Sequence, residues 1–66
     1  IMYTDEQLAL RLEMTRWIAL NVFLPDKKRM LNISDEEVAR TTQELESFSD
    51  DRLLRDYVKE NLFYNL

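Results

Sequence analysis

The side chains of this 66-residue chain that could do acid–base or metal chemistry are its carboxylates, because histidine and cysteine are both absent. That absence removes the commonest general base, the commonest metal ligand and any thiolate nucleophile. Two acidic runs remain as candidates, residues 35–37 and residues 50–51. Adjacent side chains on a helix diverge by about 100°, so neither run can converge on one atom. We therefore predict no catalytic residue, no metal site and no cofactor.

Both acidic runs lie where helices are expected to begin. Ser34 is followed three residues later by Glu37, which is the spacing of a capping box, and Thr4 and Gln7 repeat it earlier in the chain. Residues 49–50 offer two further caps. Carboxylates in a first turn are stabilised by the helix dipole, so the acidic runs are explained without chemistry. These signals predict three helices, over residues 4–23, 34–47 and 50–63.

The fold class follows from what the chain lacks as well as from these signals. It has no glycine and no alternating β pattern, and its length suits one domain. We predict a small all-α, three-helix domain with a long central first helix. Pro25 should end that helix, because the residue before a proline is disfavoured in helical geometry, although Pro25 could open a further turn through residue 31. The apolar tail at residues 63–66 should dock on the domain.

The first predicted helix carries two apolar stripes on opposite sides. One is the expected core face, formed by Leu8, Leu12, Ile18, Ala19, Val22 and Phe23. The second is formed by Leu10, Met14, Trp17 and Leu24. Either the later helices cover both stripes, or the second stripe is left for a second copy of the chain or another protein. Tryptophan and methionine are enriched at interface cores, so we predict protein binding through the second stripe.

Charge argues against nucleic acid as the main partner. The chain has 9 basic and 13 acidic residues, a net charge of −4, which repels a phosphate backbone. The one basic cluster is Lys27, Lys28 and Arg29, which either neutralises the end of the first helix or contacts phosphate or an acidic partner. The alternative function is a helix-turn-helix-like, DNA-associated transcriptional or nucleoid regulator that uses the third helix together with this cluster.

One short motif has a counterpart in a known family. Residues 42–46, Thr-Gln-Glu-Leu-Glu, resemble the Ser-Gln-Glu-Leu-Asp signature of small sporulation-control aspartyl-phosphate phosphatases, which are two-helix hairpins. The resemblance covers five residues, and the serine and the aspartate are both replaced. It implies functional roles for Gln43 and Glu46.

Taken together, the residues favour a non-enzymatic regulator or adaptor that acts by protein–protein binding, as a helical homodimer or with a different protein. A domain of this size buries only about 60% of its unfolded surface, so a second copy would reinforce it. The longest nearly apolar run, residues 17–24, is far shorter than the ~20 residues of a membrane span. Without disulfides or a visible signal peptide, we expect a cytoplasmic protein.

Overall fold

The computed structural model describes residues 2–63, and within them all regular structure is helical. Its elements are α1 (Asp5–Ile18), the π-helical turn η1 (Ala19–Phe23), α2 (Leu24–Leu31), α3 (Asp35–Ser47) and α4 (Asp51–Asn61). The first three are continuous and form one helix of 27 residues. The all-α fold with a long first helix is therefore confirmed.

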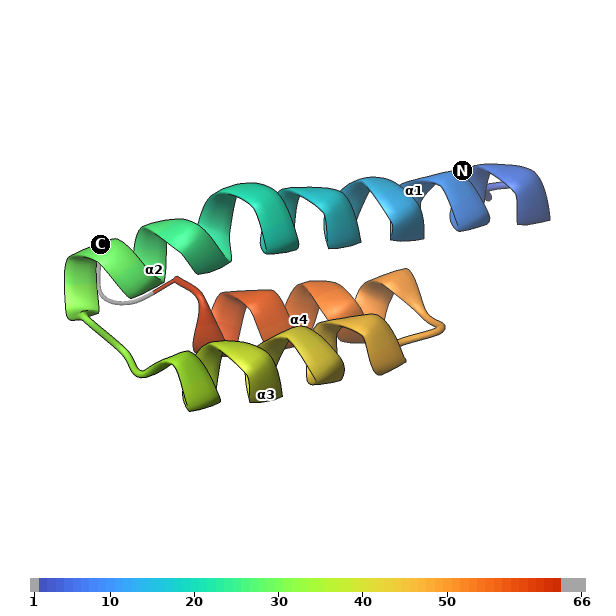
Figure 1. The fold of residues 1–66 in the computed structure, drawn as a ribbon. Helices are drawn as coiled ribbons and strands as arrows, with labels where there is room; N and C mark the ends of the chain where they lie inside the picture. The colour runs from blue at the N-terminus through green and yellow to red at the C-terminus, as the bar shows by residue number, and fades with distance from the viewer. Residues whose placement is uncertain (1, 64–66) are drawn as a thin grey trace.

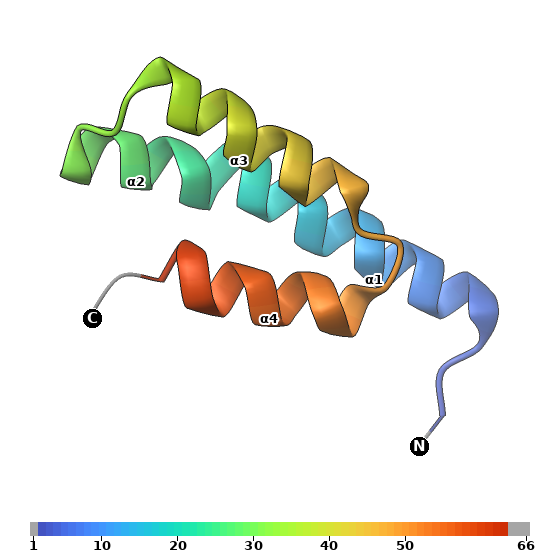
Figure 2. The same ribbon diagram turned by 90° about the horizontal axis from the view of Figure 1, so that it is seen from below.

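The long helix lies lengthwise along a hairpin made of α3 and α4 (Figure 1). Seen from below, α3 and α4 run in opposite directions along the same side of the long helix, and the first turns of α1 extend beyond the loop that joins them (Figure 2). The molecule is thin, with principal extents of 39 × 24 × 15 Å. Among residues 2–63, no other helix covers the side of α1 that is turned away from the hairpin.

The first helix does not end at Pro25, contrary to the sequence prediction. Leu24 keeps helical dihedrals (φ −67°, ψ −45°), and its N–H bonds to the carbonyl of Ala19, five residues back. Pro25 has no N–H to donate and its ring crowds the preceding turn, and a widened π turn accommodates both effects. The Asn21 side chain adds a bond from Nδ2 to the Trp17 carbonyl at 2.9 Å. The proline preference is thus overridden locally, and the helix continues to Leu31.

The chain ends its helices without glycine. Asn32 adopts the left-handed conformation (φ 54°) after α2 and donates its N–H to the Lys28 carbonyl at 2.8 Å. Asparagine tolerates this conformation better than most residues and serves as the glycine substitute. At the other ends, Thr4 forms the predicted capping box with Gln7 on α1. Ser34 caps α3 as predicted, but the Glu37 side chain pairs with Arg40 instead of closing a box. Asp50 rather than Ser49 caps α4.

Side chains of the long helix reach all four ends of the hairpin. Arg16 donates to the Leu45 carbonyl (3.3 Å) and the Phe48 carbonyl at the end of α3. Lys27 donates to the Asn61 carbonyl at 2.8 Å, at the end of α4. Thr15 bonds to Asp51 in the first turn of α4 at 2.6 Å, and Lys28 pairs with Asp35 in the first turn of α3. These polar contacts fix the hairpin along the helix.

The core is small and lies between the long helix and the hairpin. Its buried side chains are Ala19, Leu24, Leu45, Leu54, Val58 and Leu62. Phe48 and Tyr57 pack at its edge with ring centroids 5.3 Å apart. Of the apolar tail only Phe63 is described, and its ring meets Phe23 edge-on at 4.8 Å, whereas residues 64–66 lie outside the described residues.

Leu45→Ala should destabilise the fold by about 2–5 kcal/mol, because this fully buried side chain would leave a cavity at the centre of the small core. Urea denaturation followed by far-UV circular dichroism measures the loss. Leu53→Ala is the matched control, since Leu53 is 58% exposed and its truncation should change stability by about 0.5 kcal/mol or less. Equal losses for the two variants would contradict this core.

Tyr57 should make the protein less stable in strong alkali. Burial, followed by its hydrogen bond to Glu44, raises the pKa of the Tyr57 phenol from 10.0 to about 12. The folded state therefore holds the proton more tightly than the unfolded state, and this contribution to stability is present below pH 10 and is lost as the pH rises towards 12.

An absorbance titration of the phenolate checks this expectation. Tyr57→Phe should remove the late-titrating component near pH 12, whereas the control Tyr3→Phe should retain it. If Tyr57→Phe still shows the phenolate component that titrates near pH 12, that component belongs to another tyrosine and the prediction is wrong.

Candidate functional site

Three residues of the second stripe form an exposed apolar surface on α1. Leu10 is 60% exposed, Met14 is 55% exposed and Trp17 is 60% exposed. They occupy successive turns of one helical face, at spacings of four and three residues. The hairpin covers the other side of the helix, so the alternative in which later helices cover both stripes is wrong. We call Leu10, Met14 and Trp17 the outer stripe.

Leu24, the fourth residue predicted for this surface, is instead part of the core and only 3% exposed. In a regular α-helix Leu24 would lie two turns from Trp17 on the same face. The π turn places one extra residue between them and shifts every later position by about 100°. Leu24 therefore turns towards the hairpin, and Pro25 takes its place on the outer face. The burial of Leu24 follows directly from the extra residue in η1.

The predicted core stripe is only partly used. Ala19 is buried and Leu12 and Phe23 are half-buried against the core. The remaining three residues are between about a third and half exposed: Leu8 (45%), Ile18 (38%) and Val22 (40%). A two-helix hairpin is too narrow to cover the whole apolar flank of α1. Leu20, which the sequence analysis placed on neither stripe, also packs against the core.

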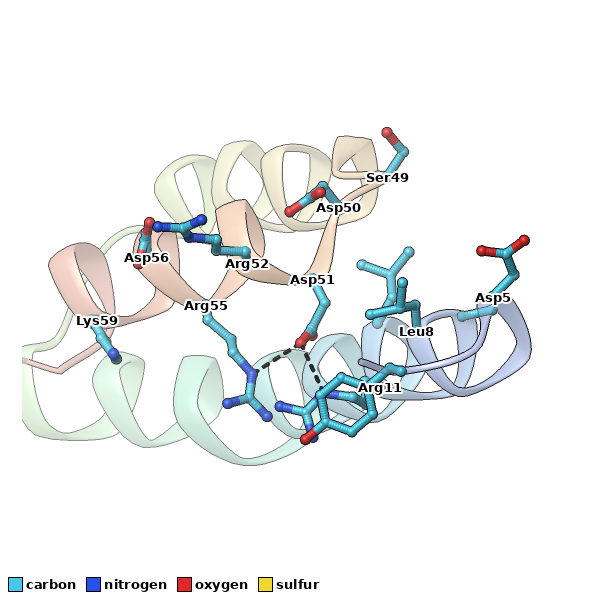
Figure 3. Close-up of a pocket in the computed structure, with 13 residues that line it drawn as sticks. Asp5, Leu8, Arg11, Ser49, Asp50, Asp51, Arg52, Arg55, Asp56 and Lys59 are labelled. Carbon is cyan, nitrogen blue, oxygen red and sulfur yellow. Dashed lines mark ion pairs between the residues drawn. The ribbon is translucent and has the colours of Figure 1, made fainter. Parts of the chain in front are cut away.

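A charged cleft of about 660 Å³ lies between the first turns of α1 and the start of α4. At its floor the Asp51 carboxylate, with its side chain 9% exposed, forms ion pairs with Arg55 and Arg11 (Figure 3) and accepts a hydrogen bond from Thr15. Thr15 Oγ1 donates to Oδ1 at 2.6 Å, and Nε of Arg55 and of Arg11 approach Oδ2 at 3.0 and 3.6 Å. The Arg11 guanidinium also lies 4.5 Å from the centre of the Tyr3 ring.

The Asp51 cluster is a structural joint between α1 and α4. Its carboxylate is satisfied by one hydroxyl and two cations, all from the chain itself. These partners hold the carboxylate between α1 and α4. Sequence reasoning assigned Asp51 only to the helix dipole. The spacing of Asp51 and Arg55, four residues apart on α4, was the available signal for their pairing.

The basic cluster is engaged within the chain. Lys27 bonds to the Asn61 carbonyl, Lys28 pairs with Asp35, and Arg29 pairs with Asp26. The Lys28 ammonium lowers the pKa of the Asp35 carboxyl from its ordinary value, through a hydrogen bond and through its charge. This geometry fits the structural role considered for the cluster. The phosphate or acidic-partner contact stays a prediction.

The two residues implied by the phosphatase resemblance lie on α3 without a cluster around them. Gln43 and Glu46 are both exposed, whereas Leu45 between them is buried in the core. Across residues 2–63, no group of three or more acidic side chains is arranged to hold a metal ion. Among those residues no helix is both long and apolar enough to span a membrane.

Comparisons with protein-family models, curated proteins and solved structures give no match to this chain. The outer stripe and the Asp51 cluster are accordingly interpreted from their own geometry. The Asp51 carboxylate already has partners within the chain, whereas the outer stripe presents three large apolar side chains to solvent, so the outer stripe is the candidate functional site.

Asp51→Asn should lower the free energy of unfolding by about 1–2 kcal/mol, because the partly exposed pairs with Arg11 and Arg55 lose their charge. Chemical denaturation at low and high salt measures this effect, and the difference from the original chain should shrink as salt screens the pairs. Asp56→Asn is the control, since Asp56 lines the same cleft and is exposed. Equal losses for the two variants would refute the structural role of Asp51.

Proposed function

We propose that this protein is a small non-enzymatic regulator or adaptor that binds another protein chain through its outer stripe. The observation that carries the proposal is the exposure of Leu10, Met14 and Trp17, each more than half open to solvent on one face of α1. Large apolar side chains scattered singly on a surface need no explanation. Three on consecutive turns, with a tryptophan among them, have the residue types and clustering of an interface centre.

The surroundings of the outer stripe also suit an interface. Glu13 and Asn21 are exposed beside it and supply a polar rim, and Ile18 and Val22 extend the apolar area along one edge. Protein interfaces commonly combine an apolar centre with a polar, hydrated rim. Polar groups at the rim can remain hydrated or find partners, so they need not oppose association.

The free energy gained by burying the outer stripe favours a partner that has an apolar surface of its own. Fully burying a leucine or methionine side chain contributes about 1.5–3 kcal/mol, and these residues are already partly covered by their own helix. The gain from three half-exposed side chains is close to the lower estimates of the entropy cost of association. Measurable affinity therefore requires the partner to contribute apolar side chains of its own. A flat, charged surface would not suffice.

Trp17→Glu should abolish binding through the outer stripe while leaving the chain folded, because the side chain lies outside the core. Far-UV circular dichroism and thermal unfolding check the fold. A photoreactive residue placed at Met14 checks the contact between the outer stripe and its partner chain. Mass spectrometry then measures the fraction of the protein that is crosslinked to a second chain. Trp17→Glu should cut the crosslinked fraction by at least about tenfold, as expected for losing an anchor residue.

Leu53→Glu is the matched control, because Leu53 is 58% exposed but lies on α4. It introduces the same charge and should leave crosslinking from Met14 unchanged. If Trp17→Glu unfolds the chain, Trp17 belongs to the folding core and the proposed surface is wrong. Unchanged crosslinking in folded Trp17→Glu would equally reject the proposal.

A further inference from the structure

We propose that the partner at the outer stripe is a second copy of this chain, paired antiparallel along the long helix. Trp17 lies near the two-fold axis, and Glu6 of one copy faces Arg29 of the other. The inference rests on the proposed function, since it names the occupant of the same surface. Its basis is the arrangement of exposed residues on both sides of Trp17.

The outer face is symmetric in position about Trp17. Leu10 precedes Trp17 by seven residues and Glu6 precedes it by eleven, which correspond to about two and three helical turns. Pro25 follows Trp17 by eight residues and Arg29 follows it by twelve, and the π turn η1 takes up one residue of each interval. Pro25 and Arg29 therefore also lie about two and three turns away, on the same face as Trp17.

The same face is complementary in charge when its direction is reversed. Glu6 is exposed at one end, and the Arg29 side chain is 70% exposed at the other. An antiparallel pair places each glutamate against an arginine at both ends of the interface. A parallel pair would place glutamate against glutamate and arginine against arginine, which is unfavourable. Charge complementarity of this kind sets orientation more than affinity.

The apolar centre fits the same arrangement. With the axis near Trp17, the two tryptophans lie side by side, and Leu10 of each copy lies over the exposed Pro25 of the other. Each copy thus supplies the matching apolar side chains that the energy estimate requires. An interface in which both copies use one patch is the usual geometry of a two-fold homodimer. Arg29 has five donors, so it can bond Glu6 of the other copy while keeping Asp26.

Self-association is tested first by concentration. Trp17 is the only tryptophan in the chain, so its fluorescence reports on this surface alone. We expect a shift of its emission to shorter wavelength as the concentration rises, in step with a doubling of the mass measured by sedimentation equilibrium. A monomeric mass with unchanged emission at millimolar concentration would overturn pairing with a second copy.

Orientation is tested by exchanging charges. Glu6→Arg and Arg29→Glu should each weaken dimerisation by roughly three- to tenfold, because each creates two like-charge contacts in the antiparallel pair. The double variant should restore the original dissociation constant, since the opposite charges again face each other. Singles without effect, or a double variant no tighter than the singles, would overturn the antiparallel arrangement.

A matched control separates pairing from helix stability. Glu36→Arg changes an exposed glutamate at the same place in the first turn of α3, so its dipole effect equals that of Glu6→Arg. It should leave dimerisation unchanged.

If the chain is monomeric but crosslinking from Met14 to a different protein is lost in Trp17→Glu, the second-copy inference fails and the proposed function stands. If crosslinking is also unaffected by Trp17→Glu, both fail.

Discussion

The structure depends on how the ends of the α3–α4 hairpin are satisfied. Every helix end exposes backbone groups without helical partners, and a chain without glycine lacks the usual means of closing a helix. Here Ser34 and Asp50 cap the first turns of α3 and α4, and the long helix supplies partners where these helices end. Arg16 and Lys27 bond to carbonyls where α3 and α4 end, while Thr15 and Lys28 bond to aspartates where α4 and α3 begin. The small core alone would leave the hairpin free to slide along an apolar flank. These polar contacts fix its position.

The same arrangement explains why the outer stripe is exposed. The inner side of the long helix is occupied by the residues that reach the hairpin ends and by the core residues between them. The hairpin is therefore held on one side and cannot move to cover Leu10, Met14 or Trp17. The stripe is exposed because the hairpin lies on one side of the long helix and is too narrow to reach the other. A surface kept open in this way is available to a partner without rearrangement of the domain.

Much of the fold could be predicted from local signals, because these act over a few residues. The caps at Thr4 and Ser34 and the stripe at Leu10, Met14 and Trp17 depend only on helical periodicity, and they lie where the sequence placed them. The burial of Leu24 could not be predicted, because it depends on a π turn that a regular period does not anticipate. The joint at Asp51 was missed because Thr15 and Arg11 are distant from it in sequence. Periodicity gives no information on such pairings.

The π turn changes the direction in which the side chains of α2 point, relative to those of α1, by a rotation about the helix axis. Its extra residue rotates α2 by about 100° relative to where an unbroken α-helix would place it. That rotation brings Lys27 and Lys28 to the hairpin. Loss of a single residue from the segment 19–23 would convert the wide turn to regular α geometry and keep both lysines facing their partners, because the residue lost is the extra one that the π turn absorbs. Regular α geometry with all five of these residues retained would instead rotate both lysines away from the hairpin by about 100°. A chain of this length therefore needs the π turn to engage the hairpin, and a chain one residue shorter at this place would reach the same engagement with an unbroken α-helix.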